Sequence, residues 1–177
     1  IPGLVLNAQQ LNQYGHFKDA FTKPHYVSEI NNDGGIILFN NLTLKGSSVF
    51  EINSGYLTIS GNYENAPSVL RIYNLSGKEL FAKTFQQTIN LRLSSNKNHC
   101  AFYDLKNICV INLLDFKTSI YYGATVFDID DEGNIALFDE AASTVNYKTQ
   151  TRKTAKPVYN IVFYNNEPLI VTYSSIY

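Results

Sequence analysis

Short runs of alternating apolar and polar residues recur along this chain around a common turn. Residues 30–40 (INNDGGIILFN) align without a gap with residues 129–139 (IDDEGNIALFD), and residues 163–173 (FYNNEPLIVTY) have the same form. Residues 93–103 are a looser copy, and residues 52–60 are a shortened one. The chain is therefore expected to repeat one structural unit.

Each copy predicts a β-hairpin. Alternation such as that of Ile89, Leu91 and Leu93 has the period of a strand. The Asn, Asp, Ser and Gly residues that follow supply the backbone conformations of a tight turn, which β-branched residues adopt poorly. The return segment is a nearly continuous apolar run, as in residues 135–138, and this predicts strands that are buried on both faces.

Further strands follow each hairpin, as in residues 69–73 and 79–85, so the unit contains four strands. Matching positions recur at roughly 35 to 40 residues, the period of a propeller blade, and these positions are Ile52, Leu93, Ile129 and Phe163. Small sheets packed around an axis bury both faces of their inner strands. The sequence thus predicts an all-β protein, a β-propeller or propeller fragment of about four four-stranded blades.

Residues 72–80 (IYNLSGKEL), together with the repeated turn, resemble the broad β-propeller group of WD40-like, YVTN-like and quinoprotein-like repeats. The segment is similar to the inner strand, Gly-Lys turn and outer strand that are common in those repeats. The chain contains no Trp and so lacks the Trp-Asp pair of WD40 repeats. Because the group shares no activity, the resemblance implies a fold and no particular site.

We interpret residues 1–177 as a single propeller-like domain, with an irregular N-terminal segment over residues 1–24 and repeats thereafter. The first copy is incomplete or differently connected, because Ile30 and Ile52 are too close together for a whole blade. The last copy stops after its second strand, with residues 174–177 at most beginning a third. Pairing of residues 4–6 with the last blade would close a ring. The alternatives are a truncated propeller with open edges and completion by a second chain, which would make a homodimer.

Composition and charge argue against two classes of partner. The formal net charge is −1, from 14 basic and 15 acidic residues, which gives no field to steer the chain onto nucleic acid or an anionic membrane. No run approaches the roughly 20 apolar residues of a membrane-spanning helix, so no transmembrane segment is expected. The basic stretch over residues 148–156 has no interleaved aromatic residues and predicts a solvated outer strand.

The chain has two cysteines, Cys100 and Cys109, too few for a disulfide framework or a zinc site. If residues 104–107 form a hairpin turn, Cys100 faces Ile111 and Cys109 faces Phe102, which makes the two thiols diagonal neighbours on one face. A shifted register would place the cysteines opposite each other and permit a disulfide. We expect buried thiols, with the disulfide as the alternative.

Residues 128–139 resemble the start of a calcium loop, with Asp128, Asp130 and Glu132 at alternate positions. The same segment aligns with the other repeated turns, and the apolar run that follows is expected to be strand, so a blade turn explains it better than a metal site. On that interpretation the carboxylates are exposed and Gly133 has a backbone role. No metal ion and no cofactor are predicted.

The chain lacks a Gly-x-Ser-x-Gly elbow, a phosphate-binding loop, a dinucleotide fingerprint and a His-Glu-x-x-His helix. Connections between the second and third strands should be exposed, and we predict ligand contact there by Tyr63, Glu64, Asp104, Lys106, Asp139 and Glu140. The expected function is a non-catalytic interaction or scaffold module, periplasmic or secreted, that presents these loops to a protein or glycan. The alternative is a fragment of a larger propeller enzyme or sensor.

Overall fold

The computed structural model describes residues 27–30, 35–38, 42–61, 67–123, 125–172 and 175–176. Within these residues the chain forms eighteen β-strands and no helix, hence no helix that could cross a membrane. The strands make five antiparallel sheets, which we number in chain order. The expectation of an all-β protein is confirmed.

The first sheet contains β1 (Val27–Ile30), β2 (Gly35–Leu38) and β3 (Thr43–Lys45). The second contains β4 (Ser48–Ile52), β5 (Gly55–Ser60), β6 (Ser68–Asn74) and β7 (Glu79–Phe85). The third contains β8 (Ile89–Leu93), β9 (His99–Asp104), β10 (Asn107–Asn112) and β11 (Thr118–Tyr122). The fourth contains β12 (Phe127–Ile129), β13 (Ile135–Asp139), β14 (Thr144–Tyr147) and β15 (Gln150–Lys153). The fifth contains β16 (Val158–Tyr164), β17 (Glu167–Thr172) and β18 (Ser175–Ile176).

Three sheets have the four strands that the repeat predicts, and in every sheet the strands lie side by side in chain order. Ile52, Leu93 and Ile129 end the first strands of the second, third and fourth sheets. The first and fifth sheets have three strands among the described residues, which agrees with an incomplete first copy and a last copy that only begins a third strand. Residues 4–6, whose pairing would close a ring, lie outside the described residues.

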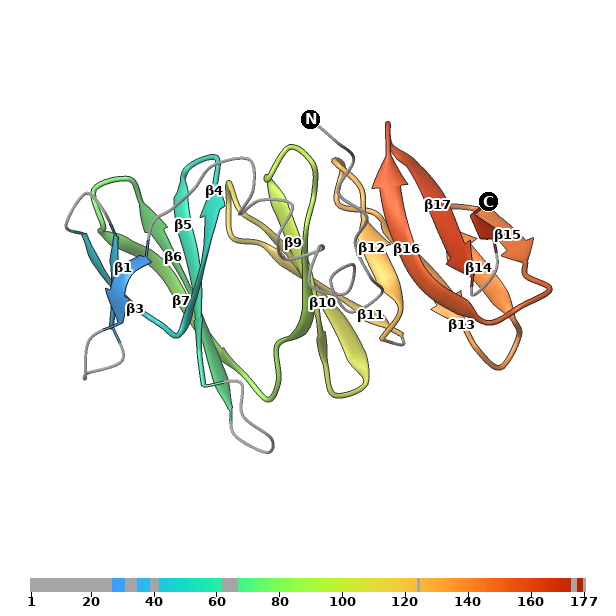
Figure 1. Ribbon diagram of the computed structural model, residues 1–177, viewed down its shortest axis with the longest axis horizontal. Helices are drawn as coiled ribbons and strands as arrows, with labels where there is room; N and C mark the ends of the chain where they lie inside the picture. Colours follow the sequence, from blue (N-terminus) through green and yellow to red (C-terminus); the bar gives the residue numbers. More distant parts are fainter. Residues whose placement is uncertain are drawn as a thin grey trace, which may run out of the picture.

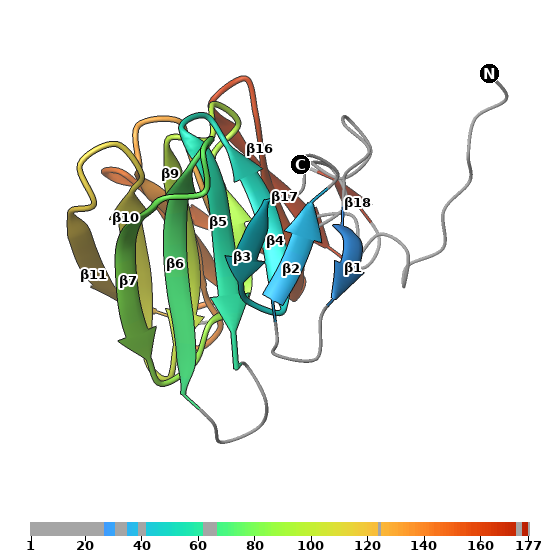
Figure 2. The ribbon, with the colours of Figure 1, turned by 90° about the vertical axis from the view of Figure 1, so that its left-hand side faces the viewer.

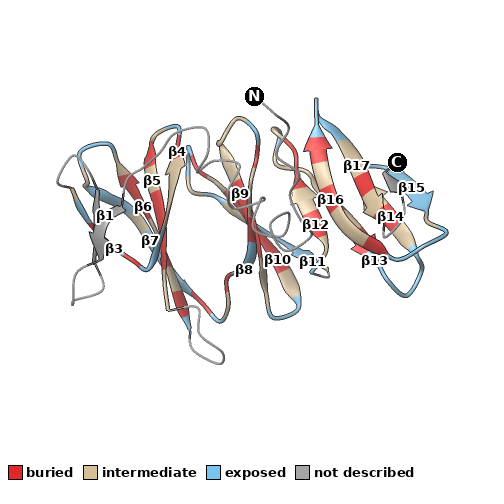
Figure 3. Ribbon diagram, viewed as in Figure 1, coloured by how far each residue is buried: buried red, intermediate tan, exposed pale blue. Residues whose placement is uncertain are grey.

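The five sheets stand face to face in one row, with the first and fifth at its two ends (Figure 1, Figure 2). A hydrophobic cluster lies at each boundary between neighbouring sheets. In β13, Ala136 and Phe138 pack toward the fifth sheet, whereas Ile135 and Leu137 pack toward the third. This confirms that the return strand has apolar contacts on both faces. Figure 3 shows buried residues within the sheets and exposed residues at many of the turns.

The hairpin of β9 and β10 has the predicted register. Its turn places Leu105 at the tip with a left-handed φ of 57°, and the strands pair Cys100 with Ile111 and Cys109 with Phe102. Both cysteines are free and belong to the same buried cluster. Burial raises the pKa of the Cys100 thiol to about 12. The prediction of buried thiols is confirmed, and the disulfide alternative is wrong.

Candidate functional site

The repeated turn between the first and second strands links neighbouring sheets through polar side chains. Asn53, between β4 and β5, donates from Nδ2 to Asn98 Oδ1 at 2.9 Å and to the carbonyl of Asn96. The backbone N–H of Asn96 in turn donates to Asp131 Oδ1 at 2.7 Å, and its Nδ2 donates to the Asp131 carbonyl at 3.1 Å. The second, third and fourth sheets are therefore joined in series by the turns that define the repeat.

Asp130 is a buried carboxylate at the centre of one such turn, with an exposure of 2%. Its Oδ1 accepts the backbone N–H of Glu132 at 2.9 Å and that of Asn134 at 2.7 Å. Its Oδ2 accepts Asn134 Nδ2 and the hydroxyl of Tyr147, both at 2.8 Å, and lies 3.6 Å from Lys148 Nζ. Burial opposes ionisation, but these hydrogen bonds outweigh it and lower the pKa of Asp130. The expectation of exposed carboxylates is wrong for Asp130, because Tyr147 on another strand covers it.

Gly133 in the same turn has the predicted backbone role. Its φ of +87° lies in the region that residues with a β-carbon rarely adopt. A β-carbon there would also lie 2.9 Å from Cδ2 of His99 on the neighbouring sheet. The glycine thus serves both the turn conformation and the close approach of two sheets.

The three candidate calcium ligands are each bound by protein groups, and Asp130 and Glu132 share Asn134 Nδ2 and Lys148 Nζ. Asp128 Oδ2 accepts the backbone N–H of Phe163 at 2.9 Å, which links the fourth sheet to the fifth. Glu132 Oε2 lies 3.1 Å from Lys148 Nζ, and Asp130 is saturated by the donors described above. Among the described residues, no group of three or more His, Cys, Asp or Glu side chains could hold a metal ion.

The residues predicted to contact a ligand fall into three groups. Tyr63 and Glu64 lie outside the described residues. Asp104 and Lys106 lie at the connection between β9 and β10, and Asp139 and Glu140 lie at the equivalent connection of the next sheet. Lys106, Asp139 and Glu140 are exposed, whereas Asp104 is partly buried.

Two of these carboxylates accept bonds that shape the chain locally. Asp104 Oδ1 accepts the backbone N–H of Gln87 at 2.8 Å and so fixes the link between β7 and β8. Asp139 Oδ1 accepts the backbone N–H of Ala142 at 3.1 Å within its own turn. Because each has a structural bond, these acids do not by themselves make a site.

An exposed apolar surface that the sequence analysis missed adjoins this connection. Leu105 is 51% exposed, Ile120 66%, Tyr121 42% and Tyr122 83%, and we call these four residues the β11 patch, in which Ile120 and Tyr122 lie on one face of β11 and Tyr121 on the other. Tyr122 pairs with Asn107 at the end of the β9–β10 turn, and the N–H of Gly123 donates to the Lys106 carbonyl at 3.4 Å. Three adjacent large apolar residues in an expected outer strand, residues 120–122, were the signal in the sequence that could have indicated this surface.

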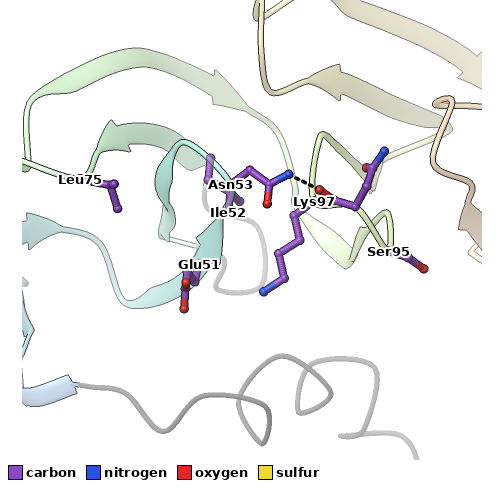
Figure 4. Close-up of a pocket in the computed structure, with 7 residues that line it drawn as sticks. Glu51, Ile52, Asn53, Leu75, Ser95 and Lys97 are labelled. Carbon is purple, nitrogen blue, oxygen red and sulfur yellow. Dashed lines mark hydrogen bonds between the residues drawn. The ribbon is translucent and has the colours of Figure 1, made fainter.

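A separate open cavity of about 600 Å³ lies where the turns of β4–β5, β6–β7 and β8–β9 meet (Figure 4). Its lining is mixed in polarity and consists of Glu51, Ile52, Asn53, Leu75, Ser95, Asn96 and Lys97. The amide of Asn53 is already held by the turn of the next sheet. The cavity is thus built on a link between sheets, at the opposite end of the third sheet from the β11 patch.

No family model and no curated protein sequence matches the chain.

Proposed function

We propose that this chain is a propeller-type module that binds a partner protein without catalysis, through the β11 patch and the connection that carries Lys106. The repeated four-stranded meanders, stacked face to face with inner strands buried on both sides, support the assignment of each sheet as a blade. A blade of this kind presents its turns and its outermost strand to solvent.

The observation that carries the proposal is the series of exposed large apolar side chains along β11 and the adjacent β9–β10 turn of the third sheet. Tyr122 at 83% exposure and Ile120 at 66% lie on the outermost strand, and Leu105 at 51% lies on the adjacent turn. Aromatic residues are enriched at protein interfaces, where a polar rim surrounds an apolar centre. Exposed Lys106 supplies such a rim. A protein surface fits this chemistry better than a glycan, because the patch offers mainly apolar contact.

The acidic residues of the repeat support a scaffold role for the turns at the other end. Asp128, Asp130 and Asp131 each accept a hydrogen bond that links strands or sheets. Buried or shared carboxylates of this kind hold the sheets together. We therefore assign partner recognition to the β11 patch, whose exposed side chains do not join neighbouring sheets.

A display selection tests the proposal. A random peptide library is enriched on the wild-type chain, and each recovered binder is assayed against Leu105→Asp/Tyr122→Asp and against Leu114→Asp. Leu114 is the matched control, because it is 63% exposed but lies in the turn between β10 and β11, at the other end of the sheet. We expect binding to be lost in the double variant and kept in the control. Binders that ignore the double variant, or a library without enrichment, would refute the assignment.

A further inference from the structure

β11 is an edge strand, and within the described part of the chain it has a strand neighbour only on the side of β10. An edge strand carries backbone N–H and C=O groups that can pair with another extended chain. The outer position of β11 in the third sheet is visible in Figure 2.

Two hydrogen bonds show which residues of β11 bond to β10 and which direct their main-chain groups outward. The N–H of Asn112 donates to the Lys117 carbonyl at 2.9 Å, and the N–H of Gly123 donates to the Lys106 carbonyl at 3.4 Å. Hydrogen-bonded and non-bonded pairs alternate along antiparallel strands, so residues 119 and 121 also bond to β10. Residues 118, 120 and 122 therefore direct their N–H and C=O groups away from the sheet. Two of these three carry the most exposed side chains of the β11 patch.

The other complete sheets protect their outermost strands with charge, and β11 does not. β7 carries Glu79 and Lys83, and β15 carries Arg152 and Lys153. Charged side chains on an edge discourage the addition of a further strand. β11, with the sequence Thr-Ser-Ile-Tyr-Tyr, has none. Its edge is open to an uncharged extended segment.

The exposed area argues for a peptide rather than a second copy of the chain. An aromatic side chain offers about 150–250 Å², and with the lower figure for Leu105 and Ile120 the four residues of the β11 patch present roughly 360–490 Å² per copy. Two copies paired edge to edge would bury roughly 730–980 Å² from the patch, below the roughly 1,000 Å² of a stable interface. An extended peptide needs less area, because main-chain hydrogen bonds supply part of its affinity.

We propose that β11 binds an extended, uncharged segment of a partner protein by strand addition, with apolar side chains opposite Ile120 and Tyr122. This inference rests on the interaction function proposed above. The added strand pairs with the outward N–H and C=O groups of Thr118, Ile120 and Tyr122. Its alternate side chains then lie beside the exposed side chains of Ile120 and Tyr122 on one face of the extended sheet.

The probe is an acetylated and amidated octapeptide of alternating Val and Thr, which carries no charge. We expect the amides of Thr118, Ile120 and Tyr122 to exchange with solvent deuterium roughly tenfold more slowly when the peptide is saturating. The amides of Ser119 and Tyr121 are internal controls, since they already bond to β10. A second peptide of the same sequence, N-methylated at every residue, cannot donate main-chain hydrogen bonds and should not bind.

Two variants separate the main chain from the side chain. Ile120→Ala removes apolar contact but keeps the outward N–H, whereas Ile120→Pro also removes that N–H. Proline is tolerated on an edge strand where the lost N–H faces solvent. We expect Ile120→Pro to bind the octapeptide roughly tenfold more weakly than Ile120→Ala. The exchange measurement on the wild-type chain decides the matter if the proline variant does not fold.

The outcomes distinguish this inference from the proposed function. Equal binding by the two variants, unchanged exchange at residues 118, 120 and 122, or no binding of the octapeptide would overturn strand addition. The proposed binding function would still be supported if the binders from the display selection require the β11 patch. A concentration-dependent doubling of mass that Ile120→Pro abolishes would show that a second copy occupies the edge, which overturns the peptide assignment.

Discussion

Asp130→Asn is the substitution whose effect the structure defines most fully. The asparagine retains one carbonyl oxygen, which can accept the N–H groups of Glu132 and Asn134 in place of Oδ1. It replaces Oδ2 with an NH₂ group, which then faces the donor Nδ2 of Asn134 and loses the attraction of Lys148. The hydroxyl of Tyr147 can rotate to accept, and Nδ2 of Asn134 loses the bond to Asp130 and keeps only its contact with Glu132 Oε2 at 3.2 Å.

The expected loss of stability is the cost of one hydrogen bond to a buried carboxylate. Loss of a buried hydrogen bond to a charged group costs about 1.5–3 kcal/mol, so the free energy of unfolding should fall by about 2 kcal/mol at neutral pH. For a domain of this size the melting temperature should drop by roughly 4–8 °C. Asp139→Asn is the matched control. Its carboxylate is exposed and accepts one bond, from Ala142, that an amide oxygen can keep, so its effect should stay within about 0.5 kcal/mol.

The effect of Asp130→Asn should depend on pH in a defined direction. The pKa of Asp130 is lower in the folded state than the unfolded value of about 3.9. Its ionised form therefore stabilises the fold fully above about pH 4, and this contribution is lost as the pH falls through the folded-state pKa. Urea denaturation of both proteins should give a constant difference between about pH 5 and 8 and a smaller difference in acid. Equal stability at pH 7, or a difference that does not shrink in acid, would refute the buried-acceptor argument.

Three further outcomes are expected. Gly133→Ala should lower the free energy of unfolding by about 1–2 kcal/mol, because φ is positive there and the added β-carbon would meet His99. Part of this loss should disappear in a His99→Ala background, and an equal loss in both backgrounds would exclude the contact. Asn53→Ala should cost about 1 kcal/mol by urea denaturation, since it removes the side-chain hydrogen bonds from Asn53 to the turn of the third sheet, and a neutral result would show that these bonds add nothing. Cys100 and Cys109, whose pKa values burial raises, should react with a thiol reagent at pH 8 only after denaturation, and rapid modification of the folded chain would contradict their burial.

Local chemistry determined the parts of the fold that the sequence predicted. The turn over residues 104–107 and the alternation around it were enough to place Cys100 opposite Ile111 and Cys109 opposite Phe102. The continuous apolar run at residues 135–138 was enough to predict contacts on both faces. These features depend on neighbouring residues and on strand pairing across a short turn, which sequence spacing records directly.

The features that the sequence did not predict depend on contacts between distant elements. Asp130 becomes buried because Tyr147 is brought over it by the fourth sheet's third strand, and no local pattern specifies that approach. Ile120, Tyr121 and Tyr122 have the composition of a core strand, and they are exposed because β11 lies at the edge of its sheet. Tyr63 and Glu64, at the equivalent connection of the second sheet, lie outside the described residues.

The measurement that tests the central claim most directly is hydroxyl-radical footprinting of the chain with and without a binder from the display selection. Oxidation of Leu105 and Tyr122 should fall severalfold in the complex, because the β11 patch is where we place the partner. Leu114, which is 63% exposed at the other end of the sheet, should be oxidised at the same rate in both samples. Unchanged oxidation of Tyr122 in the presence of a saturating binder would contradict the assignment of the β11 patch as the interaction surface.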